Sequence, residues 1–339
     1  MDFKNLGRRP AAPPPAGRNP WIRVGAIAAG VVVLVMGIVA WYWSREPDVF
    51  WVDWHQEGRP AVTGYATTQT LVRVATTLLE KPGGYLSNDI TPPSVFLDNI
   101  PNWEFGVLVQ VRDLARVMRN DFSRSQTQSI EDPDLAEAEP NFNFDNNSWI
   151  LPASESKYRE AIRHVEAYLA RLAGDGQPPG QFYARADNLR EWLAVVEKRL
   201  GNLSQRLSAS VGQVRVNTDL AGDPSAEASD AGPDDVVVKT PWLEIDDVFY
   251  EARGTAWALV HFLRAVEYDF RQVLEDKNAE VSLRQVIREL EAGLAPMRSP
   301  IVLNGRGYGI FANHSLVMAS YLSRANQAVT NLRELLDQG

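Results

Sequence analysis

The residues best suited to chemistry lie in one irregular segment, residues 82–104. It reads PGGYLSNDITPPSVFLDNIPNWE and combines aromatic rings with amides and carboxylates, while its prolines disfavour a regular helix or a central strand. Rings and hydrogen-bonding groups on one loop suit the binding of a peptide or a glycan. The candidate binding residues are Tyr85, Asn88, Asp89, Asp98, Asn99 and Trp103. The alternative is a loop that caps a helical bundle, with Trp103 in the core and Asp89 and Asp98 as turn and capping residues.

Glu104, which follows this loop, is the candidate for acid catalysis. A cell-wall glycosidase needs a carboxylic acid in apolar surroundings, and in some cases a second carboxylate. Glu104 has aromatic neighbours in the sequence NWEFG and lies where a helix is expected to begin. An acid in that position also stabilises a helix through the helix dipole, without any catalytic role.

Other catalytic and metal-binding patterns are missing from the sequence. The chain has no cysteine, which excludes disulfides, thiolate nucleophiles and cysteine metal sites. The four histidines are far apart and form no helical zinc motif; they are His55, His164, His261 and His314. The G-x-G-x-G run at residues 305–309 lacks the strand–turn–helix context of a nucleotide-binding fold and is typical of a turn. We therefore expect no cofactor and no metal site.

The elements that position these residues begin with an apolar stretch near the N-terminus. Residues 24–43 carry no charge, and about 20 apolar residues are enough for a helix to cross ~30 Å of hydrocarbon. Aromatic residues at both ends match the two membrane interfaces. A cleaved signal peptide would have a shorter apolar core followed by small residues. The sequence thus predicts an uncleaved transmembrane helix that contacts the lipid bilayer through residues 21–43.

The charges on either side of this helix predict its orientation. The preceding 23 residues contain five basic residues and one acidic residue, whereas the chain as a whole has a net charge of −9. The positive-inside rule places the N-terminus in the cytoplasm and the rest of the chain across the membrane. In a Gram-negative bacterium the protein would lie in the inner membrane with a periplasmic domain. The acidic body also argues against nucleic acid as a partner.

The expected organisation has four parts in chain order. These are a disordered cytoplasmic tail at residues 1–20, the transmembrane helix at residues 21–43, a stalk at residues 44–62 and a helical domain at residues 63–339. Within that domain, residues 217–235 are rich in Asp, Ser, Ala, Gly and Pro, which predicts a disordered acidic linker.

The helical domain is expected to be an all-α bundle of long helices. Apolar residues recur at helical spacing over about residues 65–81, 103–124, 243–276, 280–294 and 314–337. Residues 125–150 are polar and rich in asparagine, and we expect a long excursion there. Residues 153–214 show heptad-like spacing on both sides of a short turn, which predicts two antiparallel helices packed together as a coiled-coil-like hairpin. Such a hairpin could also serve as a surface arm for self-association or for a helical partner.

The stretch KPGGYLSNDITPPSVFLDNIPNWEFGVLVQVRDLAR, residues 81–116, together with the anchor before it, carries a family resemblance. It resembles an uncharacterised family of proteobacterial single-pass inner-membrane proteins, known only as a domain of unknown function. The resemblance covers most of residues 40–337. It implies an inner-membrane protein with a periplasmic helical domain, and it brings no catalytic residues.

Two functional hypotheses follow. The first is a non-enzymatic scaffold or adaptor, anchored in the membrane, that binds other proteins of the bacterial cell envelope or itself. The alternative is a peptidoglycan hydrolase or transglycosylase with Glu104 as general acid. A sensory role has less support, because a tail of ~23 residues leaves no room for a cytoplasmic output domain.

Overall fold

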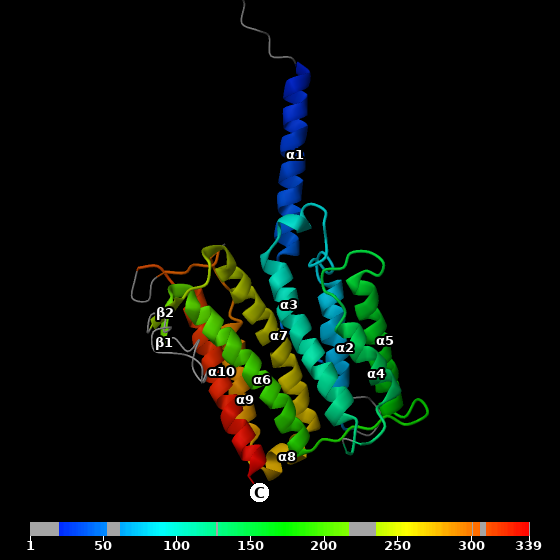
Figure 1. Cartoon of the computed structure of the whole chain (residues 1–339). Coiled ribbons are helices and arrows are strands. Elements are labelled where there is room, and N and C mark those ends of the chain that lie inside the picture. Colours follow the sequence, from blue (N-terminus) through cyan, green and yellow to red (C-terminus); the bar gives the residue numbers. More distant parts are fainter. Residues whose placement is uncertain are drawn as a thin grey trace, which may run out of the picture.

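The computed structural model describes residues 20–52, 62–126, 128–216, 235–299, 301–305 and 310–338. Three expectations fall largely outside these residues: the cytoplasmic tail, the acidic linker apart from Asp235, and the glycine run apart from Gly305. In the part of the chain that is described, one isolated helix, α1, stands away from a bundle formed by all the other helices (Figure 1). The expected all-α bundle is confirmed.

The helix bounds follow the apolar periodicity at most positions. The described residues form ten α-helices: α1 (Pro20–Trp43), α2 (Tyr65–Glu80), α3 (Asn99–Val117), α4 (Pro133–Phe142), α5 (Ser154–Leu172), α6 (Ala186–Ser208), α7 (Ile245–Asp269), α8 (Arg271–Asp276), α9 (Glu280–Gly293) and α10 (His314–Asp337). Shorter elements are the 3-10 turns η1 (Ser94–Phe96), η3 (Ala209–Val211) and η4 (Trp242–Glu244), and the π turn η2 (Met118–Phe122). Two strands, β1 (Gln213–Val216) and β2 (Asp235–Val238), pair antiparallel.

α1 is the one helix among the described residues that is long and apolar enough to cross a membrane. Most of its side chains are exposed, as illustrated by Ile27 and Leu34, and its last residue, Trp43, is partly buried against the bundle. Large apolar side chains exposed over a complete helix are unfavourable in water, whereas hydrocarbon solvates them.

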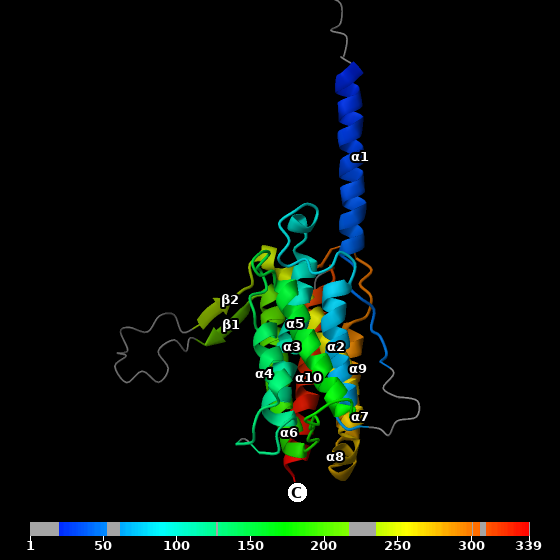
Figure 2. The same ribbon diagram turned by 90° about the vertical axis from the view of Figure 1, so that its right-hand side faces the viewer.

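α3 and α7 form the centre of the bundle, and their backbones touch. A Cβ atom added at Gly106 would overlap the carbonyl oxygen of Glu251, and one added at Gly254 would overlap the carbonyl oxygen of Trp103. The two glycines therefore permit an approach that a larger residue would block. α2, α4 and α5 cover one side of this central pair, and α6, α9 and α10 cover the other (Figures 1 and 2).

The segment predicted to be a stalk, residues 44–62, instead packs on the bundle where the structure describes it. The guanidinium of Arg253 on α7 donates to the Glu46 carboxylate, with an Nε–Oε1 distance of 2.7 Å. The backbone amide of Phe50 donates to Nε2 of His261 at 3.1 Å. The described part of the segment is held on α7 because a buried guanidinium needs a carboxylate partner, and Glu46 supplies it. The rest of the predicted stalk, residues 53–61, lies outside the described residues.

Residues 125–150, predicted to be a long excursion, contain the helix α4, which the sequence analysis did not predict. The Asp132 carboxylate caps α4 and accepts a hydrogen bond from the Leu135 amide at 3.3 Å. Leu135, Ala138 and Phe142 form its buried stripe. Three apolar residues in a polar surrounding are too few to produce a clear periodic signal, which explains why the sequence did not reveal the helix.

The heptad-spaced residues do form two helices, α5 and α6, but the two do not pack together as a hairpin. α5 packs against α4 and α2, whereas α6 packs against α10 (Figure 1). The connection between α5 and α6 crosses the end of the bundle, where the amide of Tyr183 donates to the carbonyl of Phe122 at 2.7 Å. Heptad spacing indicates which face of a helix is buried and leaves the partner open, so the predicted pairing was wrong.

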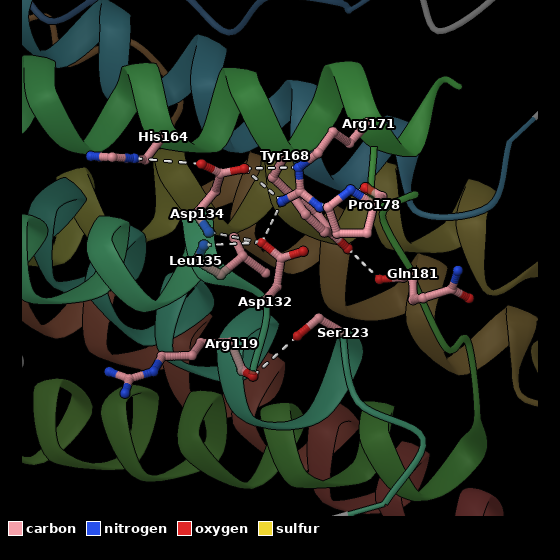
Figure 3. A network of polar contacts seen from close by, with 10 residues as sticks. All are labelled: Arg119, Ser123, Asp132, Asp134, Leu135, His164, Tyr168, Arg171, Pro178 and Gln181. Carbon is pink, nitrogen blue, oxygen red and sulfur yellow. Dashed lines mark hydrogen bonds and ion pairs between the residues drawn. The ribbon is translucent and has the colours of Figure 1, made fainter. Parts of the chain in front are cut away.

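A buried polar network explains why α5 joins α4 (Figure 3). Arg171 on α5 donates to the carboxylates of Asp132 and Asp134, each at 2.6 Å. It also donates to the carbonyl of Pro178 at 3.2 Å, which secures the connection toward α6. A guanidinium shared between two carboxylates offsets the cost of burying the charges and determines which helices meet.

Candidate functional site

The structure divides the predicted binding loop between core and surface. Trp103, Tyr85 and Asn88 are buried, Asn99 is partly buried, and Asp89 and Asp98 are exposed. Asn99 and Trp103 lie on α3 and the other four lie in the loop before it, and the six do not present one binding surface.

The buried members of this set hold the loop in place. The Tyr85 hydroxyl donates to the carbonyl of Asn146 at 3.1 Å, and burial raises the pKa of Tyr85 above its usual value. The Asn88 amide donates to the carbonyl of Ser148 at 2.8 Å. Exposed Asp98 caps α3. These contacts match the alternative expectation of a loop that caps the bundle.

Glu104 is fully buried and paired. Its carboxylate lies 2.5 Å from Nζ of Lys81, whose side chain is also fully buried. It accepts hydrogen bonds from the amides of Leu86 and Ser87 at 2.9 and 2.8 Å. A general acid must hold a proton and reach the substrate, whereas this carboxylate pairs with a lysine and has no exposed surface. Its geometry is that of an anchor for the loop.

The described histidines also have structural partners. Nδ1 of His261 lies 2.7 Å from the carbonyl oxygen of Trp257, and burial lowers the pKa of His261 to about 4. Nδ1 of His314 accepts a hydrogen bond from the amide of Leu303 at 3.0 Å, and burial lowers its pKa. His55 lies outside the described residues. Within the ranges given above, no group of three or more His, Cys, Asp or Glu residues could hold a metal ion.

A cleft of about 600 Å³ opens between α3 and α6, with α7 also contributing to its wall; we call it the α3/α6 cleft. Its charged lining residues are Asp113, Arg116, Lys198, Arg199, Arg206 and Glu251. Four of these are cations and two are anions, so the lining is net positive although the whole chain carries −9. The lining also includes apolar groups of Phe105, Val109 and Leu203.

Two of the four cations are engaged within the cleft. Arg199 donates to the buried Asp113 carboxylate at 2.7 Å, and this hydrogen bond raises the pKa of Arg199. Arg206 pairs with Glu251 at 2.8 Å. Lys198 forms no ion pair with a described residue. Among the described residues, Arg116 pairs only with Asp113, at 3.4 Å, and its side chain remains 49% exposed. Lys198 and Arg116 are therefore available to an anionic ligand.

Gln110 adds an uncommitted polar group to the same cleft. Its side chain is 2% exposed, and its Nε2 donor has no hydrogen-bond partner among the described residues. Leaving such a donor unpaired costs roughly 1–3 kcal/mol. The exposed side chains of Lys198 and Arg116 give the cleft the chemistry of a site for a carboxylate-bearing ligand.

Comparison with known proteins gives a family for the chain. The profile of a family described as an uncharacterised protein conserved in bacteria (DUF2333) matches residues 17–339. The chain belongs to this family. The match confirms the resemblance carried by residues 81–116 and runs through α1 as well as the bundle, so the apolar helix is part of the DUF2333 sequence. No curated protein and no solved structure matches the chain.

Sequence reasoning missed the cleft of this DUF2333 protein. Asp113, which is buried, and Arg116, which is exposed, lie on one predicted helix, and Lys198 and Arg199 lie on another. Asp113 and Arg199 are 86 residues apart in the sequence. Within the sequence of each helix, nothing distinguishes these charged residues from other polar residues. Only the packing of α6 beside α3 brings them together.

Proposed function

We propose that this protein is a membrane-anchored, non-enzymatic adaptor of the bacterial cell envelope that binds an acidic segment of a partner protein in the α3/α6 cleft. The observation that carries this proposal is the excess of positive charge in that cleft on a strongly acidic chain. Complementary charge accelerates encounter and selects partners of the opposite sign. The apolar groups of the lining would contribute contact area beside the ionic contacts.

The proposal places α1 across the inner membrane, with the N-terminus in the cytoplasm and the bundle in the periplasm. The five basic residues within residues 1–23 support this orientation. Fusion of alkaline phosphatase to the C-terminus is expected to give an active enzyme, because the phosphatase folds only outside the cytoplasm. An inactive fusion, with an active cytoplasmic reporter at the same position, would reverse the proposed orientation.

The hydrolase alternative has lost its main support, because Glu104 is buried beside Lys81. The adaptor proposal makes no use of Glu104 or of the loop before α3. It places binding on a different face of α3, where the cations are exposed.

A pair of charge reversals tests the role of the cleft. A photo-crosslinking residue at exposed Asn202, in the lining, is combined with Arg116→Glu and Lys198→Glu in the full chain in cells. The matched control carries Arg159→Glu and Arg163→Glu, which reverse two exposed cations on α5.

The proposal expects a reproducible cross-linked partner with the unchanged cleft and with the α5 control. The cleft variant is expected to reduce the yield at least tenfold. Equal yields in the cleft and α5 variants, or no partner even with the unchanged cleft, would overturn the proposal. A cross-link to a second copy of the chain would identify self-association as the binding event.

A further inference from the structure

Large apolar side chains are exposed on four separate segments at one end of the bundle. Phe96 is 73% exposed, Leu151 is 90% exposed and Trp242 is 79% exposed. Trp149, Leu243 and Phe311 are also more than half exposed. We call these six residues the apolar rim. Exposed apolar patches of this kind are uncommon on soluble surfaces and mark a site of interaction.

Contacts between the segments place them at the same end. The loop after α2 joins the loop before α5 through the hydrogen bond from Asn88 to the Ser148 carbonyl, at 2.8 Å. The start of α3 joins the start of α7, just after η4, through the hydrogen bond from Asn102 to Asp247, at 2.7 Å. The connection between α9 and α10 lies at this end as well (Figure 1).

α1 leaves the bundle at this same end. Trp43, the last residue of α1, packs against Gly83 in the loop after α2, where an added Cβ would lie 2.7 Å from Cγ of Trp43. In both Figure 1 and Figure 2 the loop that carries η1 stands at the level of the last turns of α1. A bilayer spanned by α1 would therefore have its surface at the level of the apolar rim.

We propose that the apolar rim inserts into the interfacial layer of the bilayer, so that the bundle rests on the membrane surface. The inference rests on the proposed membrane anchor α1, and its partner is the lipid itself. Tryptophan, phenylalanine and leucine are the side chains that favour the boundary between headgroups and hydrocarbon. A rim at the level of the interface needs no other partner to cover it.

Apolar contact, and not attraction to anionic lipid, carries this docking. The loop that bears Phe96 also bears the exposed carboxylates Asp89 and Asp98. These groups would be repelled by anionic headgroups, which removes the usual electrostatic contribution to surface binding. Docking is therefore expected on neutral phosphatidylcholine and to show little gain from anionic phosphatidylglycerol.

The absence of cysteine from the sequence allows a direct depth measurement. Single nitroxide labels are placed by Phe96→Cys, Leu243→Cys and Val281→Cys in the full chain reconstituted in phosphatidylcholine vesicles. Val281 is the matched control, because it is an exposed apolar residue at the start of α9, at the opposite end of the bundle. A fourth label, by Leu34→Cys, reports on α1.

Collision with oxygen, which concentrates in lipid, is compared with collision with a water-soluble nickel complex. The ratio of the oxygen collision rate to the nickel collision rate is expected to be at least threefold higher for the labels at positions 96 and 243 than for the label at position 281. Equal ratios at the three positions, with position 34 deep in lipid, would overturn docking and leave the anchor intact. A label at position 34 that is exposed to water would overturn the anchor.

Two further outcomes also decide the question. Labels at positions 96 and 243 that are shielded from both reagents would indicate a protein partner or a second copy, and would overturn the lipid assignment. A ratio that rises strongly only when phosphatidylglycerol is added would overturn the apolar mechanism.

Discussion

The carboxylate of Asp269, the last residue of α7, accepts hydrogen bonds from both the backbone amide and the hydroxyl of Thr67, each at 2.7 Å. Its other oxygen accepts from the amide of Gly64 at 2.9 Å. α2 begins after Gly64, whose φ of 88° suits glycine and which has no side chain to serve as a cap. Asp269 therefore caps α2 from a different helix and fixes the start of α2 to the end of α7.

Asp269→Ala is expected to lower the free energy of unfolding by about 1–3 kcal/mol, because it leaves buried amides of α2 unsatisfied. Urea titration of the full chain in detergent, followed by circular dichroism, measures the change. Asp98→Ala is the control, since Asp98 caps α3 at an exposed position where water can replace the carboxylate. A larger loss from Asp98→Ala than from Asp269→Ala would contradict the assigned role.

Gly254→Ala is expected to destabilise the bundle by more than 3 kcal/mol, roughly the upper range of single substitutions. The added methyl group would overlap the carbonyl oxygen of Trp103 and push α3 away from α7. Gly201→Ala on α6 is the matched control, because its added Cβ would meet only Nδ2 of Asn326, at an ordinary contact distance of 3.5 Å. Thermal unfolding of the two variants is compared, and similar midpoints would show that the helices tolerate separation.

Glu104→Gln is expected to cost about 3–5 kcal/mol of stability, because it leaves the buried ammonium of Lys81 without a counter-charge. The double variant Lys81→Met with Glu104→Gln removes both charges and should be more stable than Glu104→Gln alone. Limited proteolysis within residues 82–98 would report loosening of the loop. A single variant with unchanged stability that instead loses release of peptidoglycan fragments would favour the hydrolase hypothesis.

Stability is expected to fall on acidification because of His261. Burial lowers the pKa of His261 to about 4 from the ordinary 6.5, so between these values the unfolded chain binds a proton that the folded chain does not. The contribution is fully present above pH 6.5 and is lost as the pH falls toward 4, by up to roughly 3 kcal/mol. Protonation would also remove the acceptor that holds the Phe50 amide.

Urea titrations of the parent chain and His261→Gln between pH 7.5 and pH 4.5 isolate this effect. The parent is expected to lose more stability than the variant over this interval. Burial raises the pKa of Asp269 to about 6, which gives an opposite slope between 3.8 and 6. That slope is common to both proteins and cancels in their difference. If the free energy of unfolding changed equally with pH in the two proteins, His261 would be excluded as the source of the loss of stability.

The sequence by itself determined the parts of this protein that depend on local pattern. The uncharged apolar run defines α1 by its length alone, and Leu71, Val74 and Leu78 define the buried face of α2 by their spacing. The all-α class follows from the repetition of that spacing. Such signals are read within one helix, because the periodicity of the backbone relates residues three and four positions apart.

Only the tertiary structure decided which faces meet. The burial of Glu104 depends on Lys81, and the cap of α2 depends on Asp269, which lies 202 residues after Thr67. Arg171 joins α5 to α4, where the heptad pattern had indicated α6. An apolar stripe indicates that one face of a helix is packed against another helix. Which helix that is depends on specific polar contacts and close backbone approaches. Those interactions join distant positions, so no local pattern of the sequence contains them.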